Sequence, residues 1–370
     1  MRRHFENVRK IVVKVGTSVI TKPDGTLDGG CMQDIARQCC DIIEQGRMVT
    51  VVTSGAIGSG VKELGLKELP KDIPTRQGAA AVGQSILMEE WRKSFRKSGA
   101  RVAQILLTYE AFSNRRTYLN LKNSMAILTK SGTVPIINEN DPISVHEIET
   151  TFGDNDKLSA LVAANTDADL LILLTDVDGL YDKNPRHKDA RLIREVTAMT
   201  SKIDRMAGEA SSWRTKGGMR TKIEAAKIAT KSNCAMIIAS AREEDVLTRL
   251  LGGEEIGTLF RPRKAGYTNR ERWIRFSKSH GTISVDGRAK DALLAGASLL
   301  PSGILSVGGE FESGCLVSLV HEKREIAKGI VEYSSEELKR IKGRKSDQIE
   351  TILGYNSSDN AVKRENMAFP

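Results

Sequence analysis

Long apolar segments, paired cysteines and export signals are missing from this 370-residue sequence. It contains no run of 18 apolar residues, so it predicts no membrane-spanning helix. The basic N-terminus is followed by only a short apolar run, which does not fit a signal peptide. The five cysteines form no CxxC pair, which argues against a zinc site or a disulfide framework. These absences favour a protein of the reducing cytoplasm whose cysteines are mostly small buried hydrophobic residues.

Histidines, aromatic residues and the common nucleotide-binding signatures are also scarce. The five histidines stand mostly in polar surroundings, which favours surface positions over catalytic bases. No Walker A motif or GxGxxG fingerprint is present, and Ser54 does not lie in a GxSxG elbow, so a nucleophilic hydrolase fits poorly. Aromatic residues make up only 5% of the chain and form no RNP-like motif, which weakens the case for RNA recognition.

What is present is the composition of an ordinary globular protein, with 40% hydrophobic and 28% charged residues. The net charge of +9 suits anionic partners such as nucleotides or nucleic acid. A chain of this length predicts two domains, at about 150 residues per domain. After about Ile256 the composition changes to a basic stretch and then to short strand-like runs with glycine turns. We therefore expect a first domain at residues 1–260, a basic linker at 261–279, a small mainly-β domain at 280–358 and a polar, frayed tail at 359–370.

Strand-like and helix-like segments alternate through the first domain. Short apolar runs predict strands at 11–15, 49–52, 102–107, 134–137, 170–174 and 235–239. Helical patterns lie between them, and the one at 78–91 carries small residues that would allow close packing beneath the sheet. This alternation predicts an α/β fold with a mainly parallel sheet covered by helices on both faces.

Polar side chains gather where one predicted strand ends and the next helix is about to begin. Asn138, Glu139, Asn140 and Asp141 directly follow the run at 134–137, and Asn155 and Asp156 precede a helical pattern. Ligands of open α/β sheets bind at the carboxyl ends of strands. Helix capping would explain about one of these side chains. It does not explain two separate clusters of amide and carboxylate side chains, which therefore favour a ligand site.

Three glycine-containing segments are suited to phosphates. Lys14 lies in a buried strand that ends in Gly16-Thr17-Ser18, and a buried ammonium is costly unless it reaches a partner. The segments 54–58 and 216–222 add a glycine turn after a strand and a basic helix start, where backbone N–H groups bind anions. The alternatives are a solvated edge lysine and flexible glycine turns. Phosphoryl transfer needs such positioning and charge neutralisation, and Asp156 and Asp176 could orient the lysines or hold magnesium through water.

Together these segments closely resemble the amino acid kinase family, in the branch that phosphorylates glutamate and carries a C-terminal PUA domain. The resemblance covers about residues 9 to 356. The matching segments, in order and at compatible spacing, are Val13–Ser18, Val52–Ile57, Ala81–Ser85, Ile137–Asp141, Gly153–Asp156, Leu174–Asp176, Gly217–Met219 and Thr221–Lys222.

The resemblance implies a three-layer α/β/α sandwich around a sheet of roughly eight strands, followed by a PUA domain. It implies a reaction in which ATP, with Mg²⁺, phosphorylates L-glutamate to L-glutamyl 5-phosphate in the first step of proline biosynthesis. It also implies a homo-oligomer, either dimer or tetramer, with functional coupling to a glutamyl-phosphate reductase. Weak RNA binding through the PUA domain is a further expectation.

The resemblance also assigns roles to individual residues. Lys14 and Lys222 correspond to phosphate-stabilising lysines, and Asp156 to the carboxylate that organises them. The implied glutamate-binding set is Ser54, Asp141 and Asn155, with Asn138 as a neighbour. The implied ATP-binding residues are Lys14, Thr175, Asp176, Lys216, Gly217, Gly218, Met219, Arg220, Thr221 and Lys222. No metal ligand is assigned.

The chemistry of the residues agrees with these roles. Asp141 suits the ammonium of glutamate, and Ser54 with backbone N–H groups suits a carboxylate. Because the attacking carboxylate is already ionised at neutral pH, no general base is required.

One segment departs from the family pattern, and two other functions stay open. The family usually carries Gly-Thr-Gly-Gly-Met where this chain has Thr215-Lys216-Gly217-Gly218-Met219. The alternatives are an RNA-binding or RNA-modifying protein, on account of the basic stretch, and a kinase of the same fold for another acid or a nucleotide.

Overall fold

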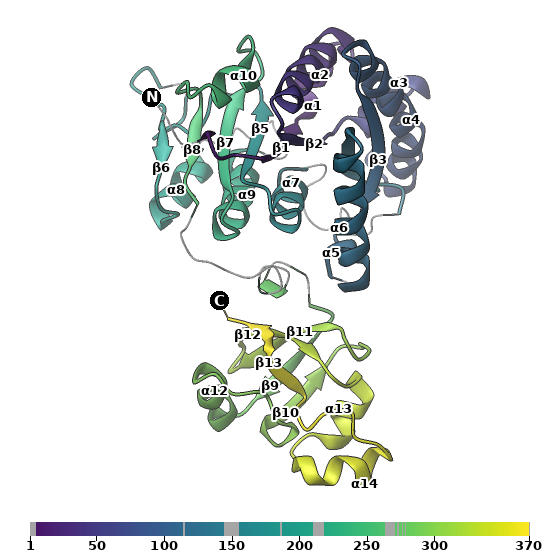
Figure 1. Cartoon of the computed structure of the whole chain (residues 1–370), viewed down its shortest axis with the longest axis vertical. Coiled ribbons are helices and arrows are strands. Elements are labelled where there is room, and N and C mark those ends of the chain that lie inside the picture. The colour runs from purple at the N-terminus through teal and green to yellow at the C-terminus, as the bar shows by residue number, and fades with distance from the viewer. Residues whose placement is uncertain are drawn as a thin grey trace. The chain divides into compact units, whose positions relative to one another are not determined.

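The computed structural model describes residues 5–113, 115–143, 155–185, 187–209, 218–262, 271, 274–275, 277 and 279–369. The chain forms two compact units, and most of the second is coloured from green to yellow in Figure 1. The first contains Met1–Thr108 and Lys122–Gly266, and the second contains Tyr109–Leu121 and Tyr267–Pro370. Segment 109–121, which the sequence assigns to the first domain, thus belongs to the second unit. Its Tyr118 is buried in a cluster with Ile274, Leu316, Ile330 and Ala368.

The described residues of the first unit build an eight-stranded sheet with the order β3-β4-β2-β1-β5-β7-β8-β6. Neighbouring strands are parallel except for β7 and β8, which are antiparallel. The strands are β1 (Lys10–Val15), β2 (Met48–Val52), β3 (Arg101–Leu107), β4 (Thr133–Glu139), β5 (Leu170–Thr175), β6 (Glu195–Val196), β7 (Ala235–Ser240) and β8 (Thr258–Phe260).

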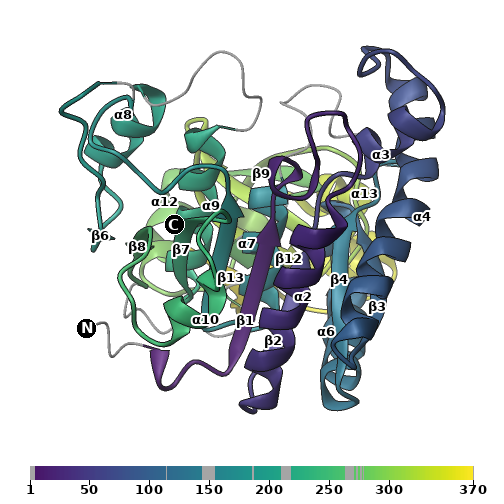
Figure 2. The same ribbon diagram turned by 90° about the horizontal axis from the view of Figure 1, so that it is seen from above.

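Helices lie on both faces of this sheet (Figure 2). On one side α2 packs against α4 and α10, and on the other α9 packs against α7 and α8. The predicted three-layer α/β/α sandwich is therefore confirmed. The helices of this unit are α1 (Thr17–Ile20), α2 (Gly29–Glu44), α3 (Ala56–Glu63), α4 (Ile73–Lys97), α6 (Arg115–Lys130) from Lys122 onward, α7 (Asn155–Asn165), α8 (Ser201–Glu209), α9 (Met219–Lys231) and α10 (Val246–Leu251). Helix α5 (Glu110–Ser113) and the first part of α6 belong to the second unit.

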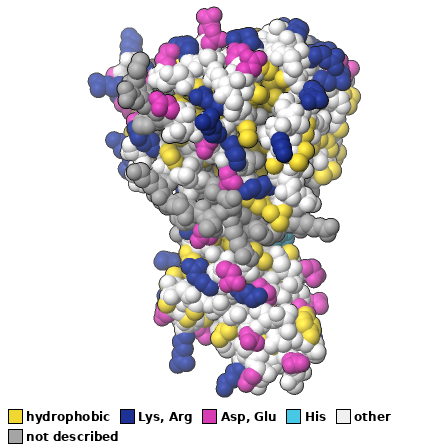
Figure 3. Space-filling view, in the orientation of Figure 1, with side chains coloured by type: hydrophobic (Ala, Val, Ile, Leu, Met, Phe, Trp, Pro, Cys, Tyr) yellow, Lys and Arg dark blue, Asp and Glu magenta, His cyan; other side chains and the backbone are white. Residues whose placement is uncertain are grey.

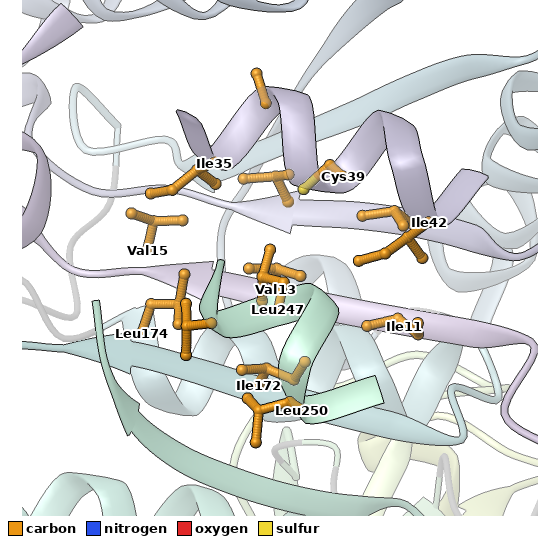
Figure 4. Close-up of a cluster of buried hydrophobic side chains, with 14 of the residues drawn as sticks. Ile11, Val13, Val15, Ile35, Cys39, Ile42, Ile172, Leu174, Leu247 and Leu250 are labelled. Carbon is orange, nitrogen blue, oxygen red and sulfur yellow. The ribbon is translucent and has the colours of Figure 1, made fainter. Parts of the chain in front are cut away.

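Strand β1 lies in the middle of the sheet, and its alternating side chains serve two different purposes. Ile11, Val13 and Val15 face α2 and α10, where they meet side chains that include Cys39 and Leu247 (Figure 4). Each such buried aliphatic side chain stabilises the fold by about 1.5–3 kcal/mol. Because successive side chains of a strand point to opposite faces, the intervening residues Val12 and Lys14 lie on the face covered by α7. The hydrophobic alternation of β1 therefore determines where its one buried lysine points.

The second unit is a small mainly-β domain whose described strands have the order β10-β9-β11-β12-β13. Its strands are β9 (Gly281–Val285), β10 (Ile304–Gly308), β11 (Leu316–His321), β12 (Arg324–Val331) and β13 (Val362–Ala368), and its helices are α12 (Gly287–Leu294), α13 (Ser335–Ile341) and α14 (Ile349–Leu353). Helix α13 begins with a capping box between Ser334 and Glu337.

The expectation of a frayed C-terminal tail is wrong. Strand β13 pairs with β12, with Met367 opposite Gly329 and Val362 opposite Val331. Val362 and Met367 are 0% and 1% exposed. These apolar side chains, scattered among polar residues in the sequence, anchor the segment because the sheet offers them a buried face.

The surface carries charges of both signs, and on the face seen in Figure 3 Lys and Arg side chains are interspersed with Asp and Glu. Within the described residues, no helix combines the length and the hydrophobicity that crossing a membrane requires.

The small residues predicted in 78–91 serve the contact between α4 and α3. A Cβ atom added at Gly83 would lie 1.8 Å from the carbonyl oxygen of Ala56. One added at Gly60 would lie 1.7 Å from the carbonyl oxygen of Ala79. The two helices therefore touch backbone to backbone, and this contact holds the start of α3, directly after Ser54 and Gly55, in place.

We predict that Gly83→Ala destabilises the protein by more than about 3 kcal/mol, because a backbone carbonyl cannot yield as a side chain does. Urea unfolding of the purified protein measures this loss. Gly78→Ala in the same helix is the matched control, since its added Cβ meets no atom within 4 Å. It should leave stability unchanged or raise it by about 0.5–1 kcal/mol. Equal stability of the two variants would contradict the close contact.

Candidate functional site

The candidate site lies at the carboxyl ends of four neighbouring strands, β4, β2, β1 and β5. Lys14 stands near the end of β1, Ser54 follows β2, and Thr175 ends β5. The N–H of Gly16 donates to the carbonyl of Leu174 at 3.2 Å, which ties the turn after β1 to the end of β5. Parallel strands thus bring together residues that lie far apart in the sequence, as the sequence predicts.

Two elements at this edge extend further than expected. Strand β4 continues to Glu139, beyond the predicted end at Ile137, because Asn138 and Glu139 still pair with Leu106 and Leu107 of β3. Helix α7 begins at Asn155, so Asn155 and Asp156 are its first residues rather than residues before it. The result is that Asn138 and Asn155 are held by regular secondary structure and are 2% and 4% exposed.

A buried carboxylate with two ammonium groups forms the centre of the site. Asp156 Oδ1 lies 2.6 Å from Lys14 Nζ, and Asp156 Oδ2 lies 2.9 Å from Lys222 Nζ. The hydroxyl of Thr221 also donates to Asp156 Oδ2, at 3.2 Å. The side chains of Lys14, Lys222 and Asp156 are 7%, 11% and 0% exposed. The sequence prediction placed these three residues together, and the structure brings them together from β1, α7 and α9.

The cluster carries a net charge of +1, because one carboxylate faces two ammonium groups. Removing water from such charges is costly, and only close pairing makes their burial tolerable. Breaking a buried pair by removing one partner costs about 3–5 kcal/mol. The excess positive charge makes this a place where an added anion, such as a transferring phosphoryl group, is stabilised.

A chain of side-chain amides lies next to this cluster. Asn155 Nδ2 donates to the carbonyl of Thr53, to Ser54 Oγ at 3.2 Å and to Asn138 Oδ1 at 2.7 Å. Asn138 Nδ2 in turn donates to Gln84 Oε1 at 2.7 Å. Ser54, Asn138 and Asn155, three of the four residues predicted to bind glutamate, therefore lie within one hydrogen-bonded group. Helix capping alone does not explain Asn155, because these contacts lead away from the backbone of its own helix.

The loop after β2 is held from several sides. The N–H of Thr53 donates to the carbonyl of Ile137 at 2.8 Å, and Trp91 Nε1 donates to Thr53 Oγ1 at 2.9 Å. Gly55 has a φ of 101°, a left-handed conformation that favours glycine, and forms the N-cap of α3. Sequence reasoning missed the contribution of Gln84 and Trp91, which lie on α4. The sequence signal that could have revealed them is that both side chains carry an N–H donor, whereas the other buried residues of this helix are small or apolar.

The remaining predicted residues surround this centre less tightly. Asp141 follows β4 and is half-buried. Thr175 is 6% exposed and its hydroxyl donates to Asp176 Oδ1 at 3.1 Å, while Asp176 is exposed.

At the start of α9, Gly218 is the N-cap and Met219 is 8% exposed. The side chain of Arg220 is 82% exposed, and its Nε lies 3.8 Å from Glu224 Oε1. Lys216 and Gly217 lie outside the described residues.

A cavity of about 530 Å³ opens beside the ends of β5 and β7. Its polar lining includes Asp178, Tyr181, Arg194, Ser240 and Arg249. Burial, and then the neighbouring carboxylate of Asp178, raise the pKa of Tyr181, so its phenol keeps its proton. The volume falls in the range of small-molecule sites.

Neither the cysteines nor the acidic and histidine side chains of the described residues form a metal site. All five cysteines are free, and Cys39, Cys40 and Cys234 are buried. Burial raises the pKa of the Cys31 thiol to about 11, which keeps it protonated. Among the described residues there is no group of three or more His, Cys, Asp or Glu side chains that could hold a metal ion.

Comparison with known proteins follows the same division of the chain. The sequence model of the amino acid kinase family matches residues 9–240, and that of the PUA domain matches residues 281–353. The chain is 51% identical over 362 residues to a protein of Methanococcoides burtonii named glutamate 5-kinase, covering 98% of this chain and 96% of the relative. It is 52% identical over 375 residues to a Methanosarcina barkeri protein of that name, covering 99% and 98%. A Thermoanaerobacter relative with the same name is 47% identical over 362 residues, covering 97% of each chain.

These matches extend over the strands and helices that carry the lysine–aspartate cluster and the amide chain. By its sequence and by the family match over residues 9–240, the chain belongs to the amino acid kinase family.

Proposed function

We propose that this protein transfers the γ-phosphoryl group of ATP to the side-chain carboxylate of L-glutamate. The product is L-glutamyl 5-phosphate, and the reaction is the first step of proline biosynthesis. The observation that carries the proposal is the buried cluster of Lys14, Asp156 and Lys222 beside the amide chain. The relatives named glutamate 5-kinase, which match nearly the whole chain, support it.

The acceptor binds at the amide chain. Glutamate carries two carboxylates and one ammonium, so its site needs donors for the former and a carboxylate for the latter. Ser54 and the first residues of α3 supply donors, Asn138 and Asn155 supply amides, and Asp141 supplies the negative charge. Asn155 and Asp156 are consecutive in α7, which places the acceptor beside the charged cluster.

The transfer itself needs no general base, because a carboxylate is ionised at neutral pH. One carboxylate oxygen of glutamate attacks the γ-phosphorus as the bond to the β-phosphate oxygen breaks. Negative charge on the transferring group and the leaving ADP meets the ammonium groups of Lys14 and Lys222. Asp156 holds both lysines in position, since each of its oxygens lies within 2.9 Å of one of them.

ATP binds along the same edge of the sheet, on the side of β5 and α9. The start of α9, with Gly218 as N-cap, offers backbone N–H groups to the phosphates. Thr175 is the last residue of β5 and Asp176 follows it, and the 530 Å³ cavity is lined by Asp178 and Ser240. We assign this cavity to the nucleoside end of ATP.

Magnesium accompanies the nucleotide. This ion is usually held by substrate phosphates, waters and one or two carboxylates rather than by a protein cage. This mode of coordination fits the site, because Asp156 already pairs with two lysines and would contact the ion only through water. Asp176, which is exposed at the end of β5, is the second carboxylate in reach of the phosphates. When bound, the ion neutralises phosphate charge.

The product and the second domain suggest partners. An acyl phosphate is a reactive mixed anhydride, so we expect coupling to a glutamyl-phosphate reductase that consumes it in the cytoplasm. We also expect a homo-oligomer, either dimer or tetramer. The PUA domain makes weak RNA binding a secondary expectation, and steep salt dependence would be its signature.

The reaction is tested by ADP release with Mg-ATP and L-glutamate, with hydroxylamine present to trap an acyl phosphate. We predict glutamate-dependent ADP and an equal amount of hydroxamate. L-Aspartate is the control acid and should give neither, since its shorter side chain does not reach the cluster. Turnover with aspartate but not with glutamate, or with neither acid in a folded protein, would overturn the proposal.

The role of Asp156 is tested by Asp156→Asn. The neutral amide removes the negative charge that lies against both buried ammonium groups, so we predict a fall in kcat of about 100-fold or more. Asp169→Asn is the control, because Asp169 Oδ2 accepts the N–H groups of Arg9 and Lys10 at the other end of β1. It should lower the melting temperature and leave kcat within two-fold. Similar kcat values for the two variants would show that Asp156 is merely structural.

The two lysines of segment 216–222 should differ. We predict that Lys222→Ala lowers kcat far more than Lys216→Ala does, because Lys222 Nζ lies 2.9 Å from Asp156 Oδ2 in a nearly buried position. Lys216 stands where the family usually has threonine. Steady-state rates at saturating ATP and glutamate measure both effects, and equal losses would contradict this ranking.

A further inference from the structure

Gln84 is a buried polar residue of α4 to which the family resemblance gives no role. It is 7% exposed. Its Oε1 accepts a hydrogen bond from Asn138 Nδ2 at 2.7 Å. Its Nε2 is buried and has no hydrogen-bond partner among the described residues. The carboxamide therefore uses its acceptor and leaves its two N–H donors unused.

The orientation of this carboxamide follows from the hydrogen bonds around it. The carbonyl of Thr53 can only accept, so the group of Asn155 that faces it is the Nδ2 donor. The same Nδ2 faces Asn138, which must present Oδ1, and Asn138 therefore presents Nδ2 to Gln84. Gln84 must therefore present its acceptor, Oε1, to Asn138 Nδ2. Turning its amide would set two donors against each other, so the unused donors are a property of the whole chain of amides.

An unused buried donor lowers the stability of the fold, because it loses its hydrogen bonds to water and gains none in return. Gln84 cannot escape the cost by a shift of its helix, because the neighbouring Gly83 touches the backbone of α3. A methionine would fill similar space without a polar atom. A buried donor that stays unpaired at this cost, linked to Ser54 by three successive hydrogen bonds through Asn138 and Asn155, indicates a partner that arrives with the substrate.

We propose that Gln84 is a further glutamate-binding residue, whose Nε2 donates a hydrogen bond to a carboxylate oxygen of the bound acid. This inference rests on the proposed function. A carboxylate fits because it accepts at both oxygens, whereas the ammonium of the substrate could only oppose another donor. Binding then satisfies the buried N–H group and places it as a donor for the substrate beside the hydroxyl of Ser54. A hydrogen bond from a neutral amide to a charged carboxylate is stronger than one between two neutral groups.

The test is Gln84→Met, made both in the native chain and in an Asn138→Ala background. In both backgrounds we predict that kcat/KM for glutamate falls at least ten-fold, while the KM for ATP stays within two-fold. If Gln84 acts only through Asn138, its replacement has no further effect once Asn138 is alanine. That result, or an unchanged kcat/KM in the native chain, would overturn the proposal.

Two further variants keep the test decisive. Gln84→Glu, for use where the double variant does not fold, still accepts from Asn138 but cannot donate. It should lower kcat/KM for glutamate at least ten-fold, and an unchanged value would overturn the proposal.

Gln38→Met is the matched control, since Gln38 is also buried and donates to Asp34 and accepts from the N–H of Leu247, away from the site. It should lower the melting temperature without changing either KM. Failure of the native chain to use glutamate would instead reject the proposed function itself.

Discussion

The burial of one carboxylate between two ammonium groups is the constraint on which the site depends. Asp156 is 0% exposed, so its charge is tolerable only while Lys14 and Lys222 stay within contact. These partners come from β1 and α9, and each element must therefore be held firmly. The apolar side chains of β1 pack against α2 and α10 and keep the strand from turning (Figure 4). The same alternation that builds this core leaves Lys14 on the opposite face.

Helix α7 connects this charged cluster to the acceptor side. Its first two residues contact different parts of the site. Asn155 forms hydrogen bonds to the loop after β2 and to β4, whereas Asp156 forms ion pairs with the two lysines. A shift of α7 would disturb both groups at once. The close contact between α3 and α4 holds the other end of the amide chain, where Gln84 and the start of α3 lie. In the proposed reaction, acceptor and phosphoryl donor are thus aligned by rigid elements rather than by a single loop.

Much of this arrangement follows from local sequence pattern. The apolar runs predict the parallel strands, and the polar residues after them predict the edge at which Lys14, Ser54 and Asn138 meet. Other features depend on partners distant in sequence. Strand β4 runs on to Glu139 because β3 continues to pair with it, and β13 forms because β12 offers an edge. The role of Gln84 was hidden for the same reason, since only the fold brings α4 against β4.

The central claim is that a carboxylate oxygen of glutamate attacks phosphorus beside the lysine–aspartate cluster. It is tested most directly with L-glutamate carrying ¹⁸O in its side-chain carboxylate, in the presence of Mg-ATP and hydroxylamine. Hydroxylamine attacks the acyl carbon and releases phosphate together with the oxygen that bridged carbon and phosphorus. The account predicts one ¹⁸O atom in each phosphate released with hydroxamate, read by mass spectrometry. Unlabelled phosphate alongside hydroxamate would contradict it, because the phosphoryl group would then have reached another acceptor.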